Sequence, residues 1–218
     1  MRGFWQRFLV LLTPGVRMLL GLLAAAYLAA VMGNLVHAFN LSDWLVLNGA
    51  KFWKGQLWRL VTYALLPAGI MDLVMNCLAL VMLGGMLERH WSRTQLWLYC
   101  IVAVAGAGMA MALMQFFTST TVTGAAPMIF GLLVAWGFLS GCEIINVPVF
   151  GEITVWKLVI CVAAVSLAVI SLSMGLVSAL ILAAGGLTGW LYLWLKHKWL
   201  MSRPSHMAHS ERISRLEL

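Results

Sequence analysis

The stretch 123-TGAAPMIFGLLVAWG-137 opens with small residues and a proline and continues as an almost unbroken apolar run. Proline is tolerated in the first turn of a helix, because the backbone N–H that it lacks would have no helical partner there. The stretch therefore predicts a helix that begins near residue 125 and enters an apolar environment at once. The rest of the chain decides whether that environment is a protein core or a membrane.

The composition favours a membrane. The chain has 218 residues, of which 63% are hydrophobic and 10% are charged, and its mean hydropathy is +0.96. A soluble domain of this length cannot bury so much apolar surface, because folded proteins still expose a large area to solvent. We therefore expect a polytopic membrane protein with one compact domain.

The number of membrane spans follows from the length of the apolar stretches, since a helix needs about 20 mostly apolar residues to cross the hydrocarbon core. The sequence predicts six spans, at residues 17–38, 67–87, 95–117, 125–142, 154–172 and 174–195. The loop between the last two is short, and the polar segment 141–157, which contains Pro148, is expected to be an irregular loop.

The basic residues predict the orientation. Of the 14 Lys and Arg residues, 11 fall on one side of a six-span arrangement, which makes both termini cytoplasmic. The chain then divides into a cytoplasmic N-terminal segment (1–16), a membrane domain (17–197) and a basic cytoplasmic tail (198–218). The net charge of +7 suits an anionic lipid bilayer and does not call for nucleic acid. Short loops favour a bacterial inner membrane, and a cleaved signal peptide is a less favoured alternative for the first span.

Two polar side chains stand in the second span. Asp72 and Asn76 are four residues apart and therefore share one helix face. Asp72 falls in the first turn, where the helix dipole favours an acid. Two hypotheses stay open: a hydrated acid at the start of a helix, or the lining of a polar cavity.

The first loop is predicted to lie at the membrane–water interface. Residues 39–63 mix three tryptophans with charged side chains, which is typical of a segment lying on the outer leaflet, with a short soluble loop as the alternative.

The four cysteines fall in or beside spans and form no spacing motif, so we expect neither a metal nor a cofactor.

Four short motifs, in this order and spacing, resemble the rhomboid intramembrane serine proteases over roughly residues 44–195. They are Trp58-Arg59 in the first loop, Gly84-Gly85-x-x-Glu88 at the end of the second span, Gly124 with Gly131 around the start of the fourth, and Gly185-x-x-x-Gly189 in the sixth. The resemblance implies an all-α membrane protein, a six-transmembrane-helix rhomboid-like bundle with an interfacial first loop. It also implies that the glycines of the fourth and sixth helices let those helices touch.

The family chemistry is a serine–histidine dyad inside the bilayer, and the resemblance implies a serine at position 126 followed by glycine. This chain has Ala126 and Pro127 there. The implied histidine falls at Leu182 or Ala183, and no histidine occurs between residues 91 and 196. An activated nucleophile needs an adjacent base, and both partners are missing at these positions.

The resemblance also implies a His-x-x-x-Asn face that stabilises the oxyanion, which appears here as Asp72-x-x-x-Asn76. An ionised aspartate cannot donate a hydrogen bond and would repel a developing oxyanion. We therefore interpret the chain as a naturally inactive rhomboid-like protein, a pseudoprotease that binds transmembrane client segments without cleaving them. The candidate client-binding positions are Asp72, Asn76, Ala126 and Pro127.

Two other functions stay open at this point. The first is an intramembrane serine endopeptidase with an unrecognised nucleophile, for instance one of the outer-side serines paired with His37. The second is a transporter or channel, which six spans permit but which neither an internal repeat nor a line of polar residues supports.

Overall fold

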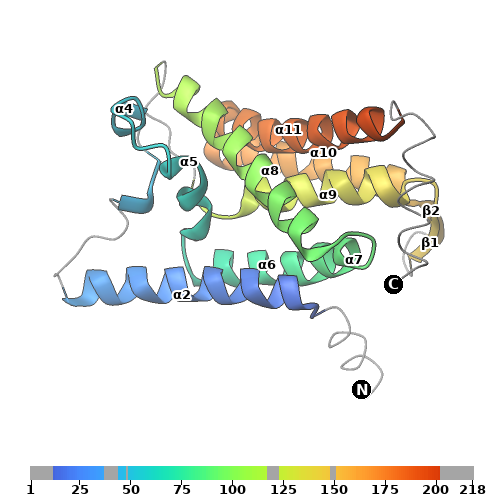
Figure 1. The fold of residues 1–218 in the computed structure, drawn as a ribbon, viewed down its shortest axis with the longest axis horizontal. Coiled ribbons are helices and arrows are strands. Elements are labelled where there is room, and N and C mark those ends of the chain that lie inside the picture. The colour runs from blue at the N-terminus through green and yellow to red at the C-terminus, as the bar shows by residue number, and fades with distance from the viewer. Residues whose placement is uncertain (1–11, 37–43, 48, 117–122, 148–150, 202–218) are drawn as a thin grey trace, which may run out of the picture.

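The computed structural model describes residues 12–36, 44–47, 49–116, 123–147 and 151–201. Most of these residues are helical, and the long helices run side by side in one bundle (Figure 1). The bundle helices are α2 (Pro14–Val36), α6 (Ile70–Ala79), the π-helical turn η2 (Leu80–Gly84), α7 (Gly85–Glu88), α8 (Arg93–Met114), α9 (Ala126–Ser140), α10 (Val155–Met174) and α11 (Leu176–Met201).

Five apolar helical stretches are long enough to cross a membrane: α2, the continuous α6–η2–α7 segment, α8, α10 and α11. They correspond to five of the six predicted spans, so those five predictions are confirmed. The fourth predicted span is α9, which has 15 residues and is therefore about 22 Å long, shorter than the hydrocarbon core of about 30 Å.

The five long apolar helices make the chain an integral membrane protein.

Two boundaries differ from the prediction. The second span begins at Ile70 rather than at Pro67, because Pro67 lies in an irregular segment before the helix. The segment predicted as an irregular loop instead forms an antiparallel hairpin of β1 (Ile144–Val147) and β2 (Gly151–Thr154), so the all-α class is corrected there. Both strands contain β-branched residues, which favours pairing even over four residues.

The first loop folds as short helical turns beside the bundle (Figure 1): α4 (Gly49–Phe52), α5 (Arg59–Thr62) and the 3₁₀ turn η1 (Tyr63–Leu65). Trp44, Trp53 and Trp58 are each half exposed or more. Phe52 is buried and packs edge-on against Trp53 with ring centres 5.0 Å apart.

Small residues let the central helices approach one another. The Tyr99 hydroxyl on α8 donates to the Gly131 carbonyl on α9 at 2.6 Å. A Cβ added at Gly189 on α11 would overlap that same hydroxyl, and one at Gly131 would lie 2.9 Å from the Ala103 Cβ. The glycines of the fourth and sixth predicted helices therefore bring α8, α9 and α11 into close contact, as the resemblance implies.

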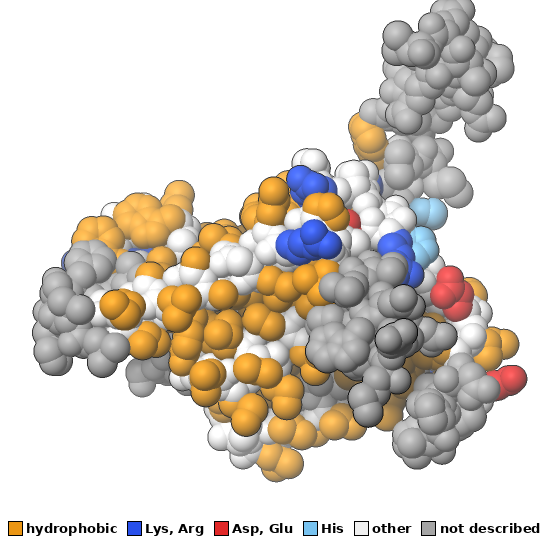
Figure 2. All heavy atoms as spheres, turned by 90° about the horizontal axis from the view of Figure 1, so that it is seen from below, with side chains coloured by type: hydrophobic (Ala, Val, Ile, Leu, Met, Phe, Trp, Pro, Cys, Tyr) orange, Lys and Arg blue, Asp and Glu red, His pale blue; other side chains and the backbone are white. Residues whose placement is uncertain are grey.

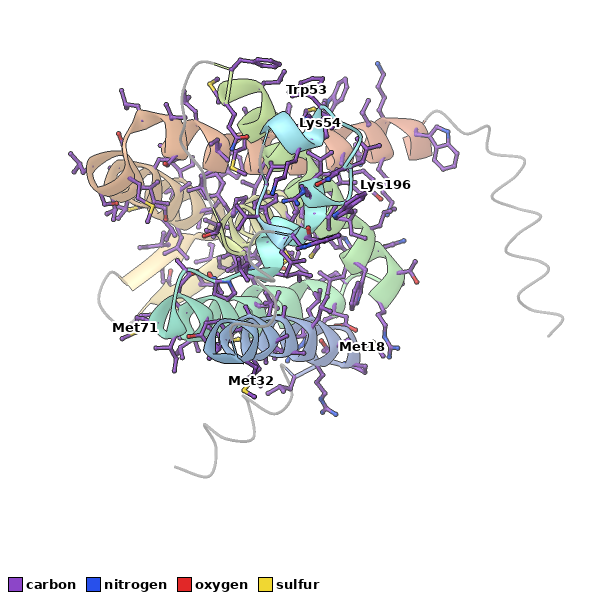
Figure 3. All side chains as sticks on the ribbon, turned by 90° about the vertical axis from the view of Figure 1, so that its left-hand side faces the viewer. Met18, Met32, Trp53, Lys54, Met71 and Lys196 are labelled. Carbon is purple, nitrogen blue, oxygen red and sulfur yellow. The ribbon has the colours of Figure 1, made fainter. Side chains whose placement is uncertain are left out.

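The surface is apolar around the bundle and basic at one end. Met18, Met32 and Met71 project outward from α2 and α6 (Figure 3) and are more than half exposed. In the space-filling view, hydrophobic side chains cover the visible face, and the Lys and Arg side chains gather mainly towards one end (Figure 2). This distribution is the one expected of helices surrounded by lipid.

Candidate functional site

A cavity of about 310 Å³ lies where α6, α9, α10 and α11 meet. Its wall is mostly apolar, and the polar side chains among its described lining residues are Asn76 on α6 and Ser166 on α10. Met75 on α6 and Val162 on α10 also line it and are 58% and 41% exposed on the bundle surface. The cavity therefore reaches the lipid-facing surface between α6 and α10.

The structure brings together the two positions at which the family resemblance implies a catalytic dyad. Ala126, the first residue of α9, and Leu182 on α11 both line the cavity. Leu182 is one of the two residues at the implied base position, and the other, Ala183, is not among the described residues that line the cavity. The two side chains are a methyl and an isobutyl group, which can neither attack a carbonyl nor accept a proton.

Asp72 and Asn76 are joined by a hydrogen bond. The Asn76 side-chain amide donates to Asp72 Oδ1 at 3.0 Å, and the backbone N–H of Ala68 donates to Asp72 Oδ2 at 3.0 Å. The bond to Asp72 uses one of the two N–H groups of the Asn76 amide, so the second N–H and the carbonyl oxygen remain for other hydrogen bonds. Asn76 is 5% exposed and lines the cavity, whereas Asp72 lies in the first turn of α6, partly exposed.

Gly124 holds the segment before α9 against Asp72. It has a φ of +96°, a conformation that L side chains rarely adopt, and a Cβ added there would lie 2.8 Å from Asp72 Oδ2. Its backbone N–H donates to the Tyr63 carbonyl at 3.2 Å. Of the two open hypotheses for Asp72, the geometry favours the acid at the start of a helix, which also orients its cavity-lining neighbour Asn76.

Pro127 occupies the first turn of α9, as the opening stretch of sequence predicts, and is buried. Its carbonyl and ring lie against Gly185 on α11, where an added Cβ would be 2.9 Å from the Pro127 oxygen. Gly185 therefore allows α11 to reach the start of α9, which places Leu182, one helical turn earlier, beside Ala126 at the cavity.

Glu88 connects the end of the second span to the start of the first. Its carboxylate accepts hydrogen bonds from the Gly15 N–H at 2.8 Å, from the Val16 N–H at 3.1 Å and from the Thr13 hydroxyl. These N–H groups have no intrahelical partner at the start of α2, so Glu88 caps a helix that is remote in sequence. Gly84, one turn earlier, packs on Val16, where an added Cβ would lie 3.0 Å from Val16 Cγ2; Gly85 is buried in α7.

Arg59 holds the first loop in place. It is 3% exposed and donates to the Val46 carbonyl and to Gln56 Oε1, each at 2.5 Å. Tyr63, a turn later, donates to the Val104 carbonyl of α8 at 3.0 Å, and burial raises the pKa of its phenol, so it stays a donor. Trp58 is half exposed beside these anchored residues.

The sequence pattern does not single out Ser166, because the hydroxyl of a serine in an apolar helix often only donates a hydrogen bond to a backbone carbonyl of its own helix. That bond is present: Ser166 Oγ donates to the Val162 carbonyl at 2.8 Å. The outer-side serines that the sequence offers lie elsewhere, with Ser173 and Ser178 bonded to carbonyls one turn earlier. His37 and Ser119 fall outside the described residues.

No histidine or carboxylate lines the cavity among the residues that the structure describes. Within the same described ranges, no three His, Cys, Asp or Glu side chains group closely enough to hold a metal ion. The cavity therefore presents an apolar wall with two hydrogen-bonding side chains.

The fold and the cavity define a class: a polytopic helical membrane protein with an internal cavity that reaches the lipid-facing surface. The chain belongs to the rhomboid family, because the family model described as Rhomboid domain matches residues 54–199. The resemblance drawn from the four motifs is thereby confirmed. A search of curated proteins finds no match to the chain.

Proposed function

We propose that this rhomboid-family protein is a pseudoprotease that binds transmembrane client segments at the α6–α9–α10–α11 cavity and does not cleave them. The observation that carries the proposal is the meeting of Ala126 and Leu182 at one cavity, at the positions that correspond to nucleophile and base. Without a nucleophile and its base, a peptide bond held there has no route to an acyl intermediate.

The hydrogen-bonding character of the cavity supports the same reading. An oxyanion needs several aligned donors, but one N–H of the Asn76 amide is bonded to Asp72 and the Ser166 hydroxyl hydrogen is bonded to the Val162 carbonyl. Among the side chains of the described lining residues, this leaves the second Asn76 N–H as the remaining donor. The acceptors that remain for a client are the Asn76 carbonyl oxygen and the lone pairs of the Ser166 hydroxyl. The site therefore suits a client helix that carries a donor, such as a serine, threonine or asparagine side chain.

Access from the lipid supports binding of a helix rather than of a soluble ligand. α10 is the least packed of the five long helices: 11% of the residues in its apolar stretch are buried within the protein, compared with 50% for α8. Small displacements of α10 therefore break few contacts, and the flexible Met75 side chain on the facing helix adapts to different client shapes. A client segment enters between α6 and α10.

We further propose a six-span arrangement in which α9 spans the thinner, protein-enclosed part of the membrane domain. The end that carries Arg89, Arg93 and Lys198 then faces the cytoplasm, and the first loop lies on the outer leaflet of a bacterial inner membrane. Cysteine labelling from either side of sealed vesicles, at Lys54 and at Lys157, tests this orientation.

Client binding is tested with two single-span peptides that differ at one position, serine or valine, at the depth of the cavity. A photoreactive residue at Ile129, which lines the cavity, should cross-link the serine peptide, whereas one at Met18, on the outer face of α2, should not. Ser166→Ala should weaken binding about threefold, the average effect of one hydrogen bond between membrane helices.

The matched control is Ser173→Ala, because Ser173 makes the same 2.8 Å bond to its own helix but does not line the cavity. It should leave binding unchanged. Equal cross-linking from Ile129 and Met18 would remove the cavity as the client site. If the wild-type protein cleaves the serine peptide and Ser166→Ala abolishes that cleavage, the pseudoprotease proposal is wrong and the endopeptidase alternative is supported.

A further inference from the structure

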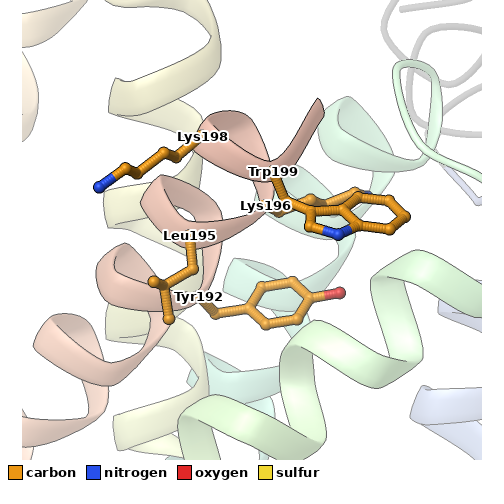
Figure 4. Close-up of a pocket in the computed structure, with 5 residues that line it drawn as sticks. All are labelled: Tyr192, Leu195, Lys196, Lys198 and Trp199. Carbon is orange, nitrogen blue, oxygen red and sulfur yellow. The ribbon is translucent and has the colours of Figure 1, made fainter. Parts of the chain in front are cut away.

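A second cavity lies at the far end of α11, remote from the candidate client site. It has a volume of about 530 Å³, and its described lining residues belong to the last turns of α11: Tyr192, Leu195, Lys196, Lys198 and Trp199 (Figure 4). Lys196 is 14 residues beyond Leu182, hence about 21 Å further along the helix axis at 1.5 Å per residue. The two cavities are therefore separate sites.

Four of the five described lining residues of this second cavity lie on one face of α11. Tyr192, Leu195, Lys196 and Trp199 follow the i, i+3, i+4, i+7 spacing of a single helix face. Tyr192, Lys196 and Trp199 project to the same side in the close-up, and Lys198 projects to the other (Figure 4). The Lys198 ammonium lies 5.2 Å from the centre of the Trp194 ring, so Lys196 is the lining lysine on the side of the Tyr192 and Trp199 rings.

The surroundings select a negative ligand. No Asp or Glu lines the cavity among the described residues. The same end of the bundle carries the starts of α2, α8 and α10, with Arg17, Arg93 and Lys157. Three acids also stand at this end: Glu88, whose carboxylate is engaged with the first turn of α2, and the exposed Glu143 and Glu152 before α10. The described Lys and Arg side chains at this end outnumber them, so an anion placed beside Lys196 meets a net positive field.

The position along the helix selects a lipid. The apolar stretch of α11 ends at Trp199, so Lys196 and Trp199 stand in the last turn of the membrane-spanning part. Lys, Trp and Tyr at this level match the amphipathic side chains that anchor helices at headgroup depth. Leu195, half exposed beside them, offers an apolar surface to a glycerol backbone or an upper acyl segment.

We propose that this cavity binds the headgroup phosphate of an anionic glycerophospholipid. The Lys196 ammonium, with three donor hydrogens, contacts the phosphate. The Tyr192 and Trp199 rings flank the headgroup, and Leu195 contacts the apolar part of the lipid. Basic pockets beside membrane helices bind anionic headgroups in this manner.

The experiment titrates the full-length purified protein with phosphatidylglycerol or phosphatidylcholine and counts bound lipids by native mass spectrometry. The wild-type protein should retain one phosphatidylglycerol more tightly than any phosphatidylcholine. Lys196→Gln should weaken that binding about fivefold, the contribution of one lysine near an anionic surface, and Lys196→Arg should restore it.

Lys157→Gln is the matched control, since it removes the same charge from an exposed lysine at the same end of the bundle but outside the cavity. It should leave the tight site intact. If Lys157→Gln and Lys196→Gln weaken phosphatidylglycerol binding equally, the lipid is held by the general positive charge of the surface and not by this cavity, and the proposal is overturned. Displacement of the lipid by millimolar inorganic phosphate, or equal retention of phosphatidylcholine, would also overturn it, by showing a site for a soluble anion or for any lipid.

Discussion

Removing the Glu88 carboxylate should release the first turn of α2. Glu88→Ala deletes an acceptor that bonds the N–H groups of Gly15 and Val16 and the Thr13 hydroxyl. Loss of a helix N-cap costs about 0.5–2 kcal/mol, and loss of a negative charge at a helix N-terminus costs about 0.3–1 kcal/mol more. The expected loss of stability is therefore about 2 kcal/mol.

For a chain of this length, about 2 kcal/mol corresponds to a fall in the midpoint of thermal unfolding of roughly 4–8 °C. Circular dichroism in a mild detergent measures that midpoint. Glu88→Gln keeps one acceptor oxygen but loses the charge, so its midpoint should fall between those of the wild type and Glu88→Ala. Hydrogen exchange of residues 13–17 should accelerate in both variants, because the loss is local to the start of α2.

Glu152→Ala is the control, because Glu152 is an exposed residue on β2 and the substitution removes the same negative charge. It should leave the midpoint and the exchange of α2 unchanged. An equal midpoint for Glu88→Ala and Glu152→Ala, with unchanged exchange at residues 13–17, would refute the capping role.

Two glycine substitutions test the close contacts. Gly189→Ala should lower the free energy of unfolding by about 1–3 kcal/mol, because the added methyl group overlaps the Tyr99 hydroxyl. Gly21→Ala is the control: a methyl group there has nothing within 4 Å, so stability should stay unchanged or rise by up to about 1 kcal/mol. Equal unfolding midpoints for these two variants would contradict the packing. Gly124→Ala should cost at least about 1–2 kcal/mol, because it forces a side chain into a positive φ and against Asp72; a wild-type midpoint would contradict the assigned conformation.

The sequence predicted the features that depend on local pattern. Five spans follow from apolar length, and the helix start at Ala126 follows from Pro127, because proline in a first turn constrains only its immediate neighbours. The hairpin was not predicted, because four-residue strands such as Ile144–Val147 are too short to show a clear alternation.

Features that join residues remote in sequence escaped prediction. The bond between Glu88 and the start of α2 joins residues more than 70 positions apart, so the motif suggested an end of a span but not a cap for another helix. Ser166 needed the helix packing to show which face of α10 borders the cavity. The family motifs pointed to Ala126 and to Leu182 or Ala183, and only the structure shows that Ala126 and Leu182 line one cavity.

The measurement that tests the central claim most directly is cleavage of a labelled transmembrane substrate by the purified protein in liposomes, beside a known active rhomboid. We expect no cleavage by the wild-type protein or by Ala126→Ser alone, because Leu182 provides no base for a new serine. Cleavage by the wild-type protein that a serine-reactive phosphonate blocks would contradict the account and would show that another serine of this chain is the nucleophile.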